Sequence, residues 1–215
     1  MFLDTDPVST NGVELEESDL EARWAHAWRP DEVARRLAGV RTPWYVAAGW
    51  ALDLFRGVES RPHSDLEIAV PAAGFAEVRD RFPGFVFDVA HSGRVWFEAD
   101  DAVLTLTHQT WLRDPVAGEW RCDVFREPHD GDTWICRRDE DLRLPYAEIV
   151  ERTADGIPHL LPELVLLFKA KAMRPKDVQD FAGVLPLLGP DRRRRLGGWL
   201  ERVHPGHPWL AAVRA

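Results

Sequence analysis

The sequence predicts an α+β fold, with a mixed sheet flanked by helices and a helical region at the C-terminal end. Two observations lead to this fold class. Short runs of alternating apolar and polar residues over 85–125 indicate several strands in succession. After about residue 152 this pattern gives way to helical periodicity. Strands grouped in the middle and helices grouped at the end favour α+β over a doubly wound parallel sheet.

Two regions follow from this change of pattern. We expect residues 1–152 to form the sheet-containing domain, with residues 1–17 as a loose, polar and acidic arm. Residues 153–215 are expected to form the C-terminal helical region. With 215 residues, the chain is long enough for one large domain and a helical appendage.

The predicted elements follow from local signals along the chain. Proline at a first helical position and glycine after the last turn mark helix ends, and Gly or Pro between apolar runs marks turns. The predicted helices cover 20–37 with a break at Pro30, 50–55, 73–82, a stretch from Pro162 to Lys171, 177–188 and 191–203. The predicted strands cover 44–47, 66–70, 85–89, 94–97, 103–107 and 120–125.

Composition excludes several classes of protein. The formal charge of −9 argues against a general nucleic-acid binder, which needs a basic surface. The two cysteines, Cys122 and Cys136, do not form a C-x-x-C pair, so neither a disulfide framework nor a zinc site is expected. No signal peptide and no membrane-spanning apolar run is recognisable. We therefore expect a cytoplasmic protein with no membrane and no nucleic-acid partner.

Three acidic residues form the candidate catalytic and metal site. Asp65 and Glu67 are two residues apart at the start of a predicted strand, so they point to the same side. Two like charges held so close are explained by a cation between them, although solvated residues that protect a sheet edge are the alternative. Asp123 lies in an otherwise apolar strand and is the candidate third acid. Mg²⁺ prefers such hard oxygen ligands together with substrate phosphates.

A small-residue turn precedes these acids. Ala48 and Gly49 stand between a predicted strand and a short helix, where backbone N–H groups can hold phosphate oxygens. A plain strand-to-helix turn is the alternative interpretation. His63, between this turn and the acids, could join a metal site or orient its own turn by hydrogen bonding.

The stretch from Gly49 to Glu67 resembles a known signature. Gly49-Trp50-Ala51-Leu52-Asp53-Leu54, followed by Gly57, Arg61, His63, Asp65 and Glu67, is similar to the pattern of aminoglycoside and lincosamide nucleotidyltransferases, within the DNA polymerase β-like superfamily. The resemblance covers 44–70 clearly, and 120–125 and 162–181 more weakly. Two positions depart from it: Ala48 replaces a glycine, and Glu67 stands where aspartate is commoner.

The resemblance implies a fold and roles for individual residues. Residues 1–152 would be a polymerase β-like nucleotidyltransferase domain. Asp65 and Glu67 would be metal ligands, and Asp123 the third acid, serving as ligand or general base. The cofactor-binding residues would be Ala48, Gly49, Arg61 and Lys169, the last being preferred over Lys171, which diverges from it by about 200° around the helix.

The resemblance also implies an activity. We expect a metal-dependent nucleotidyltransferase that moves AMP from ATP, with two Mg²⁺ ions, to a hydroxyl of a small molecule and releases pyrophosphate. The acidic balance and the ten tryptophans favour a polycationic acceptor such as an aminoglycoside, and hence a role in antibiotic resistance. The alternatives are an adenylyltransferase acting on a protein partner, as in toxin–antitoxin systems, and a non-catalytic binding module on the same fold.

Overall fold

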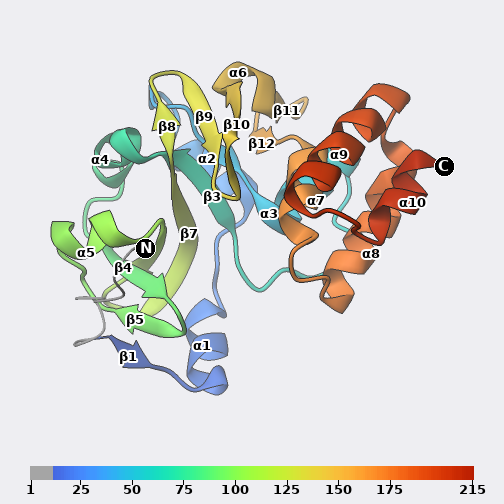
Figure 1. The fold of residues 1–215 in the computed structure, drawn as a ribbon. Coiled ribbons are helices and arrows are strands. Elements are labelled where there is room, and N and C mark those ends of the chain that lie inside the picture. The colour runs from blue at the N-terminus through green and yellow to red at the C-terminus, as the bar shows by residue number, and fades with distance from the viewer. Residues whose placement is uncertain (1–11) are drawn as a thin grey trace, which may run out of the picture. The chain divides into compact units, whose positions relative to one another are not determined.

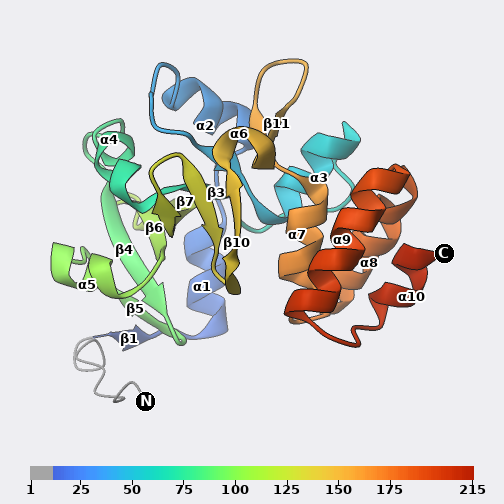
Figure 2. The same ribbon diagram turned by 45° about the horizontal axis from the view of Figure 1, so that its top comes forward.

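The computed structural model describes residues 12–215 and divides the chain into two compact units (Figures 1 and 2). Unit 1 comprises residues 1–43 and 64–127, and unit 2 comprises residues 44–63 and 128–215. Residues 1–11 of the expected arm lie outside the described part. The unit boundaries differ in position from residue 152, and the division at that residue stays a prediction.

Unit 1 is built on a mixed sheet. Its strands lie in the order β1-β5-β4-β6-β7-β3, and only the pairing of β3 with β7 is parallel. Alternate residues point into the core, including Ile68, Val89, Leu112 and Val124, none of which is exposed. The strands are β1 (Val13–Glu14), β3 (Glu67–Pro71), β4 (Val86–His91), β5 (Arg94–Trp96), β6 (Gln109–Asp114) and β7 (Glu119–Glu127).

Short helices accompany this sheet. The first of them packs against β7. They are α1 (Glu17–Trp24), α2 (Pro30–Arg36), the 3₁₀ turn η2 (Ala72–Gly74), α4 (Phe75–Arg79) and α5 (Asp101–Leu106). The break predicted at Pro30 is the first residue of α2, as expected for proline at a helix start.

The strand predicted over 103–107 is wrong, because this segment belongs to helix α5. The carboxylate of Asp100 caps the helix by accepting a hydrogen bond from the backbone N–H of Val103 at 2.9 Å, and Asp101 adds an acid in the first turn. The strand that pairs with β7 is β6, six residues further on. The turn at 115–118, ended by Gly118 with φ of 74°, brings this later segment opposite β7.

Unit 2 combines short strands with the C-terminal helices. Strand β2 (Tyr45–Val46) pairs in parallel with β12 (Pro158–Leu160), which pairs in the opposite sense with β11 (Val150–Arg152). Strands β8 (His129–Asp130), β9 (Thr133–Cys136) and β10 (Asp139–Pro145) form a separate antiparallel sheet. The first helix of the unit, α3 (Ala48–Arg56), ends at Gly57, which adopts the left-handed conformation with φ of 71°.

The helices after residue 160 pack together in both views (Figures 1 and 2). Three of them begin with proline, at Pro162, Pro175 and Pro190, because proline loses no hydrogen bond at that position. Their buried leucines include Leu164, Leu167, Leu196 and Leu200. These helices are α7 (Pro162–Lys169), α8 (Pro175–Val184), the 3₁₀ turn η3 (Leu185–Leu187), α9 (Pro190–Val203) and α10 (Trp209–Arg214), and the short helix α6 (Tyr146–Ile149) precedes them in the chain. Among residues 12–215, no helix is long and apolar enough to cross a membrane.

Candidate functional site

The sheet of unit 1 brings two of the three predicted acids side by side. Glu67 on β3 and Asp123 on β7 are direct partners in the parallel pairing, so their side chains point to the same face about 5 Å apart at the backbone. The backbone N–H of Asp123 donates to the carbonyl of Leu66 at 2.8 Å, which locks this register. The side chain of Asp123 is buried, and that of Glu67 is partly exposed.

Asp65 lies two residues before Glu67, where β3 has not yet begun. The buried thiol of Cys122 precedes Asp123 on β7. Burial raises the pKa of this thiol well above its usual value, and the negative charges of Asp123, Glu67 and Asp65 raise it further. The strand register places Glu67 beside Asp123, and Asp65 lies two residues before Glu67. We call Asp65, Glu67 and Asp123 the acid row.

Two neighbouring side chains hold the carboxylate of Asp123. The amide of Gln109 donates to Oδ2 at 2.5 Å, and the indole N–H of Trp111 donates to the same oxygen at 3.2 Å. Both donors come from β6, where Trp111 is the direct partner of Asp123. Neither residue is predicted from the sequence, because the predicted strand begins at residue 103 and β6 begins at Gln109. Alternation of Gln109 and Trp111 around buried Thr110 is the signal that would have indicated this strand.

The donor chemistry of the acid row suits Mg²⁺. That ion is commonly held by one or two carboxylates, with water and substrate phosphates completing its coordination. Glu67 and Asp123, adjacent on one face, supply such a pair. Within residues 12–215, no group of three or more His, Cys, Asp or Glu side chains is arranged so that it could hold a metal ion. The role of the three acids as metal ligands stays a prediction.

Unit 2 contains a second set of motif residues, built around Asp53 on α3. This buried carboxylate accepts hydrogen bonds from the hydroxyl of Ser60 at 2.6 Å and from its backbone N–H at 3.1 Å. Nε2 of His63 lies 2.7 Å from the same carboxylate, and the ring of His63 stacks on Trp50 at 4.4 Å. His63 thus orients its own turn, one of the two roles considered from the sequence. From the sequence, Asp53 is recognisable only as part of the signature.

The contacts of His63 indicate its tautomer. Nδ1 lies 3.3 Å from Nη1 of Arg61, and a guanidinium group can only donate. Nδ1 must therefore accept, which leaves the ring proton on Nε2 for donation to Asp53. This assignment gives each ring nitrogen one partner.

Arg61 and Lys169 lie in a network of buried charges. Asp180 accepts from Nε and Nη2 of Arg61 at 3.2 and 3.1 Å, and it lies 2.9 Å from Nζ of Lys169. Nζ of Lys169 also donates to Asp177 at 3.1 Å. The carboxylates of Asp177 and Asp180 and the ammonium of Lys169 are all at most 7% exposed. We call this set, together with Arg174, the charge network.

The pKa values of the two network carboxylates are lowered. Burial alone would raise them, but hydrogen bonds and positive charges outweigh it. Arg174 and Lys169 lower the pKa of Asp177 from 3.8 to about 2, while Arg61 and Lys169 lower the pKa of Asp180. Asp177 also accepts from the backbone N–H of Arg174 at 3.1 Å, which stabilises the start of α8.

The turn at Ala48 and Gly49 is shaped by two local constraints. Ala48 has φ of 47°, a left-handed conformation that favours glycine, the residue usual at this position in the resembling family. At Gly49, an added Cβ would lie 2.6 Å from Nη2 of Arg61 and 2.7 Å from Cε1 of His63. Gly49 therefore makes room for two side chains of its own unit. Nucleotide contacts by Ala48, Gly49, Arg61 and Lys169 stay predictions.

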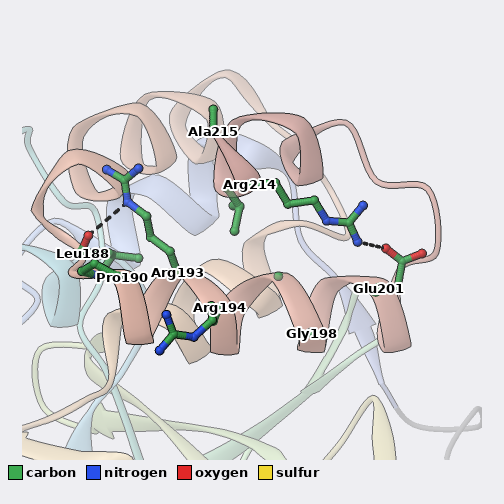
Figure 3. Close-up of a pocket in the computed structure, with 10 residues that line it drawn as sticks. Leu188, Pro190, Arg193, Arg194, Gly198, Glu201, Arg214 and Ala215 are labelled. Atoms are coloured by element: carbon green, nitrogen blue, oxygen red, sulfur yellow. Dashed lines mark hydrogen bonds and ion pairs between the residues drawn. The ribbon is translucent and has the colours of Figure 1, made fainter.

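A larger pocket in unit 2 holds none of the predicted site residues. It lies between α9 and α10, has a volume of about 860 Å³, and is lined in part by Arg193, Arg194 and Arg214 (Figure 3). Arg193 donates to the carbonyl of Leu188 at 3.1 Å, and Arg214 pairs with Glu201. These arginines are engaged with neighbouring residues of the helical region.

Solved structures share the fold. One is the solution structure of the antibiotic-resistance factor ANT(2'')-Ia, at 13% identity and TM-score 0.52, covering 86% of this chain and 88% of that one. Another is the crystal structure of ANT(2'')-Ia in complex with adenylyl-2''-tobramycin, at 11% identity and TM-score 0.53, covering 80% and 95%. The fold of the chain is therefore that of a nucleotidyltransferase, a mixed sheet flanked by helices.

The family comparison agrees with this class. The model of the family described as aminoglycoside-2''-adenylyltransferase matches residues 31–129, which include all three acids and the Gly49–Glu67 signature. The match confirms the resemblance of this part of the chain to the aminoglycoside nucleotidyltransferases. No curated protein matches the chain.

Proposed function

We propose that the protein is a nucleotidyltransferase that transfers AMP from ATP to a hydroxyl of a small molecule and releases pyrophosphate. The observation that carries this proposal is the registered pair of Glu67 and Asp123, with Asp65 two residues upstream. Carboxylates on one face of a sheet repel one another, and nearby cations stabilise them. The Mg²⁺ that accompanies a nucleoside triphosphate would be such a cation. The match to an adenylyltransferase family supports ATP as the donor and an antibiotic as the acceptor.

The three residues of the acid row would have different roles in catalysis. Asp65 and Glu67, with Asp123 as a third ligand, would hold Mg²⁺, of which we propose two ions. When bound, Mg²⁺ neutralises phosphate charge and favours departure of pyrophosphate. Asp123 would also orient the acceptor hydroxyl and take its proton. Gln109 and Trp111, by donating to Oδ2, would hold the carboxylate in one orientation.

The reaction balances as one displacement. The acceptor oxygen forms a bond to the α-phosphorus of ATP while the bond from that phosphorus to the bridging oxygen of pyrophosphate breaks. The hydroxyl proton passes to Asp123 and then to solvent. The products are the adenylylated acceptor and pyrophosphate. Because little covalent chemistry falls to the protein, positioning and electrostatics supply most of the catalysis.

Unit 2 would contribute to nucleotide binding. The first turn of α3 offers backbone N–H groups at Ala48 and Gly49, and we propose that these and the cations Arg61 and Lys169 contact the triphosphate. Calorimetric titration of ATP with Mg²⁺ into the Lys169→Arg variant tests the last of these. We expect this variant to bind ATP more weakly than the wild type, although its net charge is the same. An unchanged affinity for ATP would show that Lys169 acts only within the charge network and does not contact the nucleotide.

The decisive experiment is an acceptor screen with ATP and Mg²⁺ that follows pyrophosphate release, with aminoglycosides as the first class. Asp65→Asn should abolish any turnover found. Asp80→Asn, which neutralises an exposed acid after α4, is the matched control and should behave as the wild type. Equal rates in the wild type and the Asp65→Asn variant would overturn the proposed site.

A further inference from the structure

The register of unit 1 aligns a buried carboxylate with the candidate base. Asp88 on β4 is the direct partner of Trp111 on β6. Trp111 is in turn the partner of Asp123 on β7, and Asp123 is the partner of Glu67 on β3. Direct partners on neighbouring strands point to the same face of a sheet. Asp88 therefore shares a face with the acid row, two strands away from Asp123.

Asp88 is fully buried, and both of its oxygens are occupied. Oδ2 accepts hydrogen bonds from Nε of Arg113 at 2.7 Å and from the indole N–H of Trp120 at 2.8 Å. Oδ1 accepts from Nη2 of Arg113 at 3.2 Å and from the backbone N–H of Glu98 at 2.9 Å. Burial lowers the pKa of Arg113, but its contacts with Asp88 and Glu98 outweigh burial and raise it, so the guanidinium stays charged. This charged, two-point pairing holds the carboxylate of Asp88 in one orientation.

Asp88 in turn holds the ring of Trp120, which is also fully buried. The ring of Trp120 lies 4.5 Å from that of Trp111 between centroids, in an edge-to-face contact. Trp24 touches both rings, at 5.6 Å from Trp120 and 5.5 Å from Trp111. Rings packed this closely do not shift independently of one another. The orientation of Trp120 therefore constrains the position of Trp111.

Trp111 is the more rigid of the two donors to Asp123. Its indole N–H and the amide of Gln109 donate to the same oxygen, Oδ2. A glutamine side chain has more rotatable bonds than an indole, so Gln109 defines a direction less strictly. The indole contact is 3.2 Å long, at the upper end of the usual range, and a small displacement of the ring would break it. The orientation of the Asp123 carboxylate thus depends on where Trp111 is held.

We propose that Asp88 is a positioning residue for the transfer reaction: through Trp120 it holds Trp111 where the indole N–H orients the carboxylate of Asp123. This inference rests on the proposed function. The side chain of Asp88 is not exposed, so it would act on the reaction only through these neighbours. A purely structural ion pair with Arg113 would affect the amount of folded protein, whereas a positioning residue also affects kcat of the folded protein.

A spectroscopic experiment tests the chain of contacts without requiring turnover. The indole N–H signals of isotopically labelled protein are recorded by NMR, and the variants Trp111→Phe and Trp120→Phe assign two of the ten. In Asp88→Asn, the signal of Trp111 should move together with that of Trp120, although Trp111 donates to Asp123 and not to Asp88. Asp80→Asn, which neutralises an exposed acid of the same unit, is the matched control and should leave both signals in place. An unmoved Trp111 signal in folded Asp88→Asn would overturn the inference.

A double-mutant cycle separates positioning from stability. With any acceptor that the screen identifies, Asp88→Asn should lower kcat about tenfold or more, while the KM values for ATP and acceptor change less than about threefold. In the Trp111→Phe background, which already lacks the indole donor, the same substitution should change kcat less than about threefold. Equal reductions of kcat in both backgrounds would overturn the inference and leave the transfer activity standing. A moved Trp111 signal in a protein without transferase activity would support the chain of contacts and refute the proposed function.

A second variant tests the inference without removing the counter-charge of buried Arg113. Trp120→Phe keeps an aromatic ring and the ion pair of Asp88 with Arg113, but it removes the indole N–H. It should lower kcat about threefold or more, again with little change in either KM. The same substitution at Trp28, a buried tryptophan of unit 1 that packs on Phe82 and Phe85, is the matched control and should leave kcat unchanged. Equal values of kcat in Trp120→Phe and Trp28→Phe would overturn the inference.

Discussion

The acid row of unit 1 and the charge network of unit 2 use buried or half-buried carboxylates in opposite ways. In the network, Asp177 and Asp180 are each within 3.2 Å of two cationic side chains. In the acid row, the carboxylate of Asp123 accepts hydrogen bonds from two neutral side chains, and other carboxylates lie nearby. The first arrangement stabilises a fold, whereas the second is the one for which we propose a bound cation.

This difference helps to separate structural from catalytic members of one sequence signature. Arg61 and His63 belong to the signature as much as Asp65 and Glu67 do. Yet the structure joins Arg61 to Asp180 and His63 to Asp53, which fix the turn at 60–63. Substitutions of the carboxylates Asp53 and Asp180 should therefore act mainly on stability, and substitutions in the acid row mainly on activity.

The largest expected effect is loss of activity in Asp123→Asn. Removing the candidate base while keeping its shape should lower kcat by about 10²- to 10⁴-fold. The free energy of unfolding should stay within about 1 kcal/mol of the wild type or rise, since one of several like charges disappears. Steady-state pyrophosphate release and urea unfolding measure the two quantities. A strongly destabilised variant would show that Asp123 belongs to the structural class.

The reverse outcome is expected for Asp180→Asn. This variant leaves Arg61 and Lys169 buried with one carboxylate fewer, and breaking such a buried pair costs about 3–5 kcal/mol. Urea unfolding should show this loss. Asp191→Asn, which breaks the exposed pair with Arg194 in the same unit, is the matched control and should cost about 1 kcal/mol or less. A similar loss of unfolding free energy in both variants would show that the buried ion pair contributes no more to stability than the exposed one.

A pH titration of stability sharpens the comparison further. The pKa of Asp177 is lowered from 3.8 to about 2 in the folded protein, so its stabilisation is complete above pH 5 and is lost as pH falls toward 2. A shift of this size corresponds to roughly 2 kcal/mol. The difference in unfolding free energy between the wild type and Asp177→Asn should therefore shrink by about that amount between pH 6 and pH 2. A constant difference would contradict the lowered pKa.

The smallest expected effect concerns the turn that starts α3. Ala48→Gly relieves the left-handed conformation at φ of 47°, and the gain should exceed the entropic cost of glycine, for a net stabilisation of about 0.5–1 kcal/mol. Ala47→Gly is the control of opposite sign. Ala47 has φ of −114° and is buried, so glycine there should destabilise. Thermal unfolding of both variants measures the effect, and destabilisation by Ala48→Gly would contradict it.

Local sequence signals predicted much of the fold. Proline at first helical positions and glycine at Gly57 marked helix ends that the structure contains. The prediction of a strand at 103–107 is wrong for a physical reason. Alternation of Val, Leu and Thr fits a strand, but the cap at Asp100 favours a helix, and the hairpin partner of β7 is chosen by the turn at Gly118.

The sequence by itself determined which residues carry charge and where they stand in the chain, and these properties were enough to predict Asp65, Glu67 and Asp123 as candidate site residues. Only the tertiary structure decided their neighbours. Gln109 and Trp111 reach Asp123 through strand register, and Arg61 meets Asp180 across 119 residues of sequence. Such contacts depend on how distant segments of the chain pack together. The sequence around one partner therefore does not indicate which distant residue it will contact.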